Sequence, residues 1–245
     1  MAIVNNLLES NETNFELQAA MLVEAWLISM YEKQYEDASK LCTDFIENYG
    51  SAFNKRVFEV AASEYDKLLV LLVLVKGLHE YIELCQTTKC RSWHENNLTV
   101  EQVWFKLCDC EERLNFVANY CQSTATEKIF QDLEGLKNFF QEAFGSGTYL
   151  SPGMIADKNL CSICHRDARA CSHVEGRLYD GRVCFYQPVN PQANHVAIVK
   201  IPKDPRCRIW SWRVKDNDEG EGVKCEAPVV LSSFRVDNFL QEIGS

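Results

Sequence analysis

The chain has 245 residues, of which 47% are hydrophobic and 24% are charged. This composition excludes a low-complexity polymer or a chain disordered throughout, because enough apolar surface can be buried to offset the ordering entropy. The net charge is −10, and residues 1–145 alone hold 12 Lys and Arg against 23 Asp and Glu, a net charge of −11. Since such an acidic half repels phosphate, we do not expect it to bind nucleic acid.

The N-terminal residues MAIVNNLLESNETNF lack the basic and apolar regions of a secretory signal, so we expect a cytoplasmic protein. The longest apolar run, at 68–75, is far shorter than the roughly 20 residues that a membrane span needs. In a reducing cytosol, the twelve Cys residues are expected to be buried thiols or metal ligands rather than disulfides.

Apolar residues recur at steps of three and four through the first 145 residues, which is the period of an amphipathic helix. The pattern predicts helices at 15–33 and 36–48, the first with Asn14 as N-cap and the second ending near Gly50. A third helix is expected to begin near Phe53 and to run through the aliphatic segment to Cys85.

Two capping-box patterns predict two further helices. Thr99 followed by Gln102 marks the start of one, and Thr124 followed by Glu127 marks the start of the next, which ends near Gly145. Residues 1–145 are therefore expected to form an acidic bundle of about five helices.

The composition changes after the bundle. Gly, Ser and Pro residues predict a linker at 146–160, and 161–245 is expected to be a β-rich domain. Runs rich in Val, Ile and aromatic residues at 182–187, 195–201 and 207–214 predict strands, 216–221 predicts a solvated loop, and 234–243 predicts a short closing helix. The predicted fold class is α+β: an acidic helical bundle followed by a small zinc-binding β-rich domain.

The most specific motif is a cluster of Cys and His residues with the spacing C-x2-C-x6-C-x-H. A C-x2-C pair points two thiolates at one ion, and a second short-spaced pair completes a tetrahedron. We therefore predict a zinc ion bound by Cys161, Cys164, Cys171 and His173. Cys184 is an alternative to His173 as the fourth ligand. His165 is a further rival, although it is adjacent to Cys164 in the chain and an immediate neighbour usually projects elsewhere. The competing interpretation is a set of buried thiols or one disulfide.

Four ligands with three thiolates leave no open position for water, and thiolate donation makes zinc a poor Lewis acid. The predicted zinc is therefore structural. The run from Cys161 to Gly181, C-x2-C-x6-C-x-H-x2-G-x2-Y-x-G, resembles a small zinc-binding module of uncharacterised bacterial and phage-linked proteins. The resemblance covers residues 158–210 only; it implies a structural zinc and a mobile-element or antiviral-defence setting, and it supplies no catalytic residue.

Basic and aromatic residues surround the predicted zinc site and offer a second hypothesis. Between residues 166 and 213, nine Lys and Arg face four Asp and Glu. Such groups can hold phosphates and stack bases, although we favour the interpretation that they form a solvated face or a face that docks an acidic protein. The candidate nucleic-acid contacts are Arg166, Arg169, Arg177, Arg182, Trp210 and Trp212.

A catalytic constellation is not evident in the sequence. Arg91 and His94 resemble the arginine and histidine of helical ribonucleases of the HEPN type, but that family separates the two by four to six residues, and here two residues lie between them. We therefore expect no enzyme, and predict a noncatalytic accessory subunit that binds protein partners in a larger complex. The alternatives are a nucleic-acid-binding accessory factor and an unusual helical ribonuclease.

Overall fold

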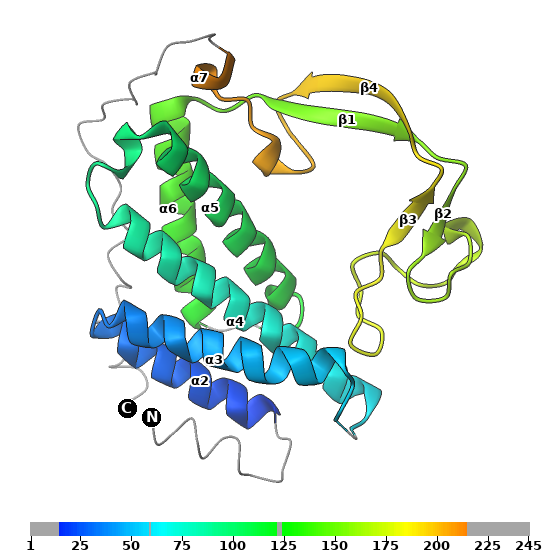
Figure 1. Cartoon of the computed structure of the whole chain (residues 1–245), viewed down its shortest axis with the longest axis horizontal. Helices are drawn as coiled ribbons and strands as arrows, with labels where there is room; N and C mark the ends of the chain where they lie inside the picture. Colours follow the sequence, from blue (N-terminus) through cyan, green and yellow to red (C-terminus); the bar gives the residue numbers. More distant parts are fainter. Residues whose placement is uncertain (1–14, 59, 122–123, 215–245) are drawn as a thin grey trace.

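The computed structural model describes residues 15–58, 60–121 and 124–214. The predicted α+β fold class is confirmed: helices occupy the N-terminal part, and two small sheets follow (Figure 1). The helices are α2 (Phe15–Tyr31), α3 (Tyr35–Asn54), α4 (Ala62–Thr88), α5 (Asn97–Ala118) and α6 (Thr124–Phe144).

Helix α4 lies at the centre of the bundle and contacts α2, α3 and α5. Its aliphatic segment packs against protein on several sides, so Leu68, Val75, Leu78 and Tyr81 are all buried. No helix within the described residues is long and apolar enough to cross a membrane.

Three predicted helix boundaries are wrong. Helix α3 continues past Gly50 to Asn54, and α4 begins only at Ala62 rather than near Phe53. Helix α5 begins earlier than the capping-box pattern indicated, because Asn96 is the N-cap and its Oδ1 accepts the backbone N–H of Thr99 at 3.0 Å.

The β region contains strands β1 (Tyr149–Ile155), β2 (Lys158–Cys161), β3 (Tyr186–Val189) and β4 (Gln192–Val199). Strands β1 and β4 pair antiparallel to form a two-stranded ribbon, and β2 pairs antiparallel with β3. Figure 1 shows the ribbon as an arm that leads from the bundle to the small β2–β3 sheet.

Parts of the β region differ from the prediction. The segment 146–160, predicted as a linker, holds β1 and most of β2, because each pairs with a strand about 25 to 50 residues away. The predicted strands at 182–187 and 195–201 overlap β3 and β4. The predicted strand at 207–214 is wrong: a 3-10 turn, η3 (Pro205–Cys207), precedes a short helix, α7 (Ser211–Val214). The predicted loop at 216–221 and helix at 234–243 lie outside the described residues.

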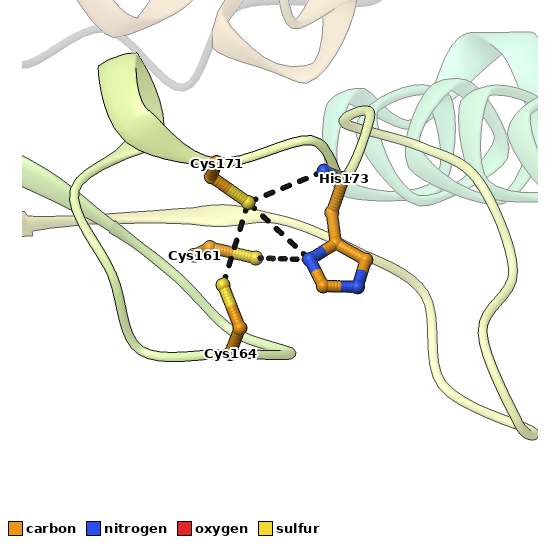
Figure 2. A group of neighbouring side chains, drawn as sticks. All are labelled: Cys161, Cys164, Cys171 and His173. Atoms are coloured by element: carbon orange, nitrogen blue, oxygen red, sulfur yellow. Dashed lines mark hydrogen bonds between the residues drawn. The ribbon is translucent and has the colours of Figure 1, made fainter.

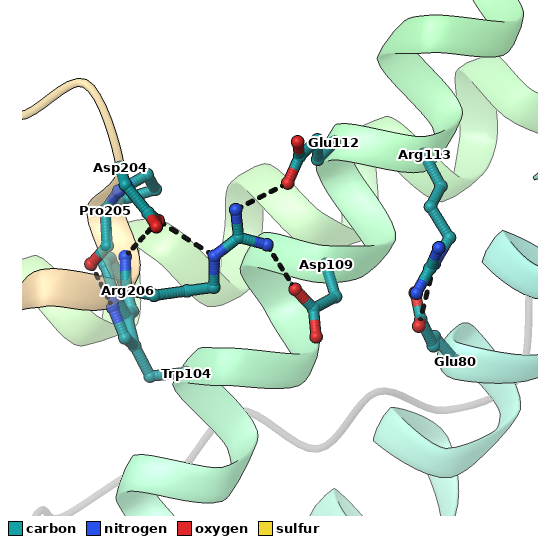
Figure 3. Close-up of polar contacts among 8 residues, drawn as sticks. All are labelled: Glu80, Trp104, Asp109, Glu112, Arg113, Asp204, Pro205 and Arg206. Atoms are coloured by element: carbon teal, nitrogen blue, oxygen red, sulfur yellow. Dashed lines mark hydrogen bonds and ion pairs between the residues drawn. The ribbon is translucent and has the colours of Figure 1, made fainter. Parts of the chain in front are cut away.

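The segment that follows the ribbon returns to the bundle. The guanidinium of Arg206 pairs with Asp109 and Glu112 on α5 and with Asp204 of its own turn (Figure 3). Beside it, Trp104 Nε1 donates to the Pro205 carbonyl at 2.8 Å. These contacts fix one end of the ribbon to α5.

A second arginine strengthens this attachment. Arg208 donates to the carbonyl oxygens of Phe144 and Gly145, at 2.9 and 2.7 Å, where α6 ends. Its guanidinium also lies over the rings of Trp104 and Trp210, at 5.0 and 4.6 Å from their centroids. Cations are favoured at a helix C-terminus and over aromatic faces, so Arg208 stabilises the C-terminal end of α6 and its contact with the two rings.

Candidate metal centre

The predicted C-x2-C pair forms a tight turn at the end of β2. His165 N donates to the Cys161 carbonyl at 2.8 Å, and Cys161 N donates to the Arg166 carbonyl at 2.9 Å. His165 has a φ of 57°, in the left-handed region that closes the turn. The turn directs Cys161 and Cys164 to the same side, and the backbone N–H of Ile163 reaches Cys161 Sγ at 3.4 Å.

The four predicted ligands lie together in a compact group. Their ligand atoms are all within 4.8 Å of one another, as the cluster in Figure 2 shows. His173 Nδ1 is 3.7 Å from Cys161 Sγ and 3.3 Å from Cys171 Sγ, and the Sγ atoms of Cys164 and Cys171 are 3.4 Å apart. Donors around a tetrahedral zinc ion are about 3.5–3.8 Å apart, given bond lengths near 2.3 Å to sulfur and 2.0 Å to nitrogen. The arrangement therefore fits one metal ion.

The surrounding backbone favours thiolates at Cys161 and Cys164. Burial raises the pKa of the Cys161 thiol, but the N–H groups of Cys164 and Ile163 and the thiols of Cys171 and Cys184 lower it more, and the pKa falls to about 7. The backbone N–H of Arg166 is the largest cause that lowers the pKa of Cys164. Burial raises the pKa of the third thiol, Cys171. Thiolates are the form that binds metal, so the shifts at Cys161 and Cys164 favour the binding of a cation.

Cys184, the alternative fourth ligand, lies beside the cluster. Its Sγ is 3.8 Å from Cys161 Sγ, and both side chains are buried. It nevertheless falls outside the group of mutually close ligand atoms, whereas His173 falls inside it. The geometry therefore favours His173 as the fourth ligand and places Cys184 as a thiol in contact with the ligand Cys161. His165 is exposed and also lies outside the group.

Residues 174–183 form a hairpin between His173 and Cys184, which we call the metal-site hairpin. Leu178 and Val183 form a β-bridge within it, and its tip is at Asp180 and Gly181. The tip contacts the bundle where α3 ends and α4 begins.

Polar contacts hold the hairpin tip. Arg56 Nη1 donates to Asp180 Oδ2 at 2.8 Å, and Gly181 N donates to Asp66 Oδ1 at 2.5 Å. The guanidinium of Arg56 also lies 4.8 Å from the ring centroid of Tyr65. No local sequence signal pointed to Arg56 or Asp66, because their partners are more than 110 residues away along the chain.

The predicted nucleic-acid residues do not form one surface. Arg166, Arg169, Arg177 and Arg182 are all exposed on the metal-binding part, and Arg169 also pairs with Asp167 at 2.7 Å. Trp210 is only 5% exposed and packs in the core beside Trp104 and Phe144.

Trp212 stacks on Trp210 and donates its Nε1 to Glu101 at 2.7 Å. Trp210 is therefore not available to stack bases, because its ring is buried in the bundle, whereas Trp212 is only partly buried. The nucleic-acid hypothesis keeps its exposed arginines and loses Trp210.

The ribonuclease hypothesis gains no support from the placement of His94. This side chain is 3% exposed, and its ring lies against Trp93 and Phe139, while Arg91 is exposed. A general base must reach its substrate. His94 is thus a core residue in the short turn η1 (Trp93–Glu95) before α5.

Comparison with known proteins identifies no relative. No family model, curated protein or solved structure matches this chain. Its function therefore has to be inferred from the chemistry and placement of its own residues.

Proposed function

We propose that Cys161, Cys164, Cys171 and His173 bind one structural zinc ion, and that the protein is a noncatalytic accessory subunit that binds protein partners. Three thiolates and one imidazole are a typical donor set for structural zinc. These donors complete a tetrahedron, so no position is left for a substrate or a reactive water. The donor geometry supports the metal assignment.

One observation carries the functional proposal: the metal-site hairpin follows the ligand His173, and its tip contacts the bundle. The contacts of Asp180 with Arg56 and of Gly181 with Asp66 tie the metal site to the start of α4. At the other end of the ribbon, Arg206 and Arg208 tie the chain to α5 and α6. We therefore expect the zinc ion and these two arginines to hold the ribbon in a fixed position. A rigid surface of this kind can bind another protein.

The partner is expected in a larger complex, and the resemblance of the Cys161–Gly181 run implies an antiviral-defence setting for it. Affinity purification of the full chain from its native host tests the proposal. We expect a stoichiometric protein partner with the native chain, and loss of that partner with Cys164→Ser, which removes a zinc ligand, and with Asp66→Ala, which releases the hairpin tip.

Glu47→Ala is a matched control, because Glu47 is an exposed acidic residue on α3 away from these contacts. It should leave the partner bound. If Cys164→Ser and Asp66→Ala retain the partner as Glu47→Ala does, or if the purified chain turns over a substrate, the proposed role is wrong.

Exposed arginines on the metal-binding part support a second candidate, an accessory factor that binds nucleic acid. Arg166, Arg177 and Arg182 would contact phosphates, and such binding weakens steeply with salt. The test is a double substitution, Arg177→Glu with Arg182→Glu. If this variant binds DNA and RNA as the native chain does, at both low and physiological salt, this candidate fails.

A further inference from the structure

The ribbon has an apolar face that no described residue covers. Leu150 pairs with Ile198 and Pro152 pairs with Val196, so these four side chains share one face, here called the outer face. Val196 and Ile198 are 68% and 70% exposed, and Leu150 is 45% exposed. The opposite face meets the bundle at Tyr149 and Val199.

The ribbon also lacks the usual protection of an exposed sheet. Its strands read YLSPGMI and QANHVAIV, without a single charged residue. Among the described residues its sheet has only two strands, whereas three strands or a packed face are normally needed for stability. Edge strands are commonly protected by charges, and β4 has none. These features indicate that another segment packs on the outer face.

We propose that this segment is the C-terminal tail, residues 215–245, which lies outside the described residues. In the tail, Val236, Phe239, Leu240 and Ile243 follow the i, i+3, i+4, i+7 spacing of an apolar helical stripe. This tail stripe supplies four large apolar side chains, and the outer face supplies the complementary uncharged surface. The inference is independent of the metal site and goes beyond the proposed function.

The tail starts close to the ribbon. Ile209 N donates to the Thr148 carbonyl at 2.7 Å and Arg208 bridges to Tyr149, so the chain passes the root of β1 just before α7. Helix α7, which ends at Val214, lies near this end of the ribbon in Figure 1. A chain of as many residues as 215–235 spans about 25 Å on average even as a random coil, and a seven-residue strand is about 24 Å long. The tail stripe therefore reaches the whole outer face.

Two quantities favour the tail over a second copy of the chain. A tethered segment has an effective concentration in the millimolar range, on the order of a thousandfold above that of a free copy at micromolar concentration. A face about 24 Å long and two strands wide is far smaller than the roughly 800 Å² per partner of a stable protein–protein interface. A single short segment fits this surface, and a globular partner does not.

Hydrogen exchange of the full chain tests the proposal. The variant Phe239→Asp with Leu240→Asp places two charges in the tail stripe, and the control Asn238→Asp with Gln241→Asp places two charges on the opposite side of the same predicted helix. We expect amides in 192–199 to exchange about tenfold faster in the stripe variant and at the native rate in the control, because loss of the cover lets the ribbon open. Equal exchange rates in all three proteins would overturn the proposal.

Two further measurements distinguish the tail from a second copy of the chain as the segment that covers the outer face. Exchange at 192–199 should be independent of protein concentration, and slower exchange at high concentration would mean that a second copy covers the face instead. Ile198→Asp should make the bond after Arg235 more sensitive to trypsin, because the tail would be released. Unchanged cleavage after Arg235 would contradict the proposal even if the ribbon itself is altered by the substitution.

Discussion

The backbone N–H of Gly181 donates to Asp66 Oδ1 at 2.5 Å, although the two residues are 115 positions apart. Gly181 has a φ of +66°, and a Cβ at this position would lie 3.0 Å from Tyr65 Cβ and 3.2 Å from Phe53 Cε2. Only glycine fits both the left-handed backbone and the close approach. This contact is the point at which the metal-site hairpin meets the bundle.

Gly181→Ala should destabilise the protein by about 2–4 kcal/mol, since it combines left-handed strain of about 1–2 kcal/mol with overpacking. Gly176→Ala is a matched control: its φ is also positive, at +82°, but nothing lies within 4 Å of the added Cβ. Chemical denaturation should show a larger loss for Gly181→Ala. Equal losses for the two variants would mean that the hairpin tip does not pack on the bundle.

His165→Gly should preserve the metal content and stabilise the turn by about 1 kcal/mol. The native His165 is left-handed and exposed, so glycine relieves strain without loss of a buried contact. His165→Val should weaken metal binding, because a β-branched residue disfavours this conformation. Competition with a zinc chelator measures both effects, and loss of metal in His165→Gly would identify His165 as a ligand after all.

Arg206→Ala should lower the free energy of unfolding by about 1–3 kcal/mol, because Asp109, Glu112 and Asp204 would lose their shared cation. Arg206→Lys should recover only part of this loss, since an ammonium group cannot reproduce the planar fork. The control Lys203→Ala removes an exposed positive charge nearby and should have little effect. If Lys203→Ala costs as much as Arg206→Ala, general charge balance rather than this cluster holds the segment.

Stability should fall in alkaline solution. Burial raises the pKa of the Cys42 and Cys85 thiols from 9.0 to about 12. The unfolded chain loses these protons near pH 9 while the folded chain retains them. The contribution of these thiols to stability is therefore constant below pH 9 and declines between pH 9 and 12 by up to about 1.4 kcal/mol per pH unit for each thiol.

Cys42→Ala should flatten this decline, and Cys90→Ala, at an exposed site, should not. Urea denaturation at a series of pH values measures the slopes. A native-like slope in Cys42→Ala would mean that this thiol ionises as readily in the folded chain as in the unfolded chain.

Local patterns predicted the helices and the ligand cluster. The ligands lie within thirteen residues, and a short turn alone brings Cys161 to Cys164, so their spacing carried the information. The helix boundaries were less predictable, because a nearby Asn96 capped α5 in place of Thr99.

Long-range contacts could not be read from the sequence. The Ser, Pro and Gly residues of strand β1 are typical of turns and predict a linker, and only pairing with β4 makes this segment a strand. The basic residues near Trp210 and Trp212 predict an exposed surface, but Arg206 and Arg208 bind α5 and the end of α6, and both rings pack against the bundle. Neither the Arg56–Asp180 contact nor the Gly181–Asp66 contact has a local pattern.

The metal content of the full chain, purified without added metal and measured by mass spectrometry, tests the central claim most directly. We predict one zinc per native chain and per Cys184→Ser chain, and less than about 0.1 zinc per chain for Cys164→Ser and His173→Ala, because structural sites need all four ligands. A native chain without zinc, or zinc lost from Cys184→Ser and retained by His173→Ala, would contradict the proposed site.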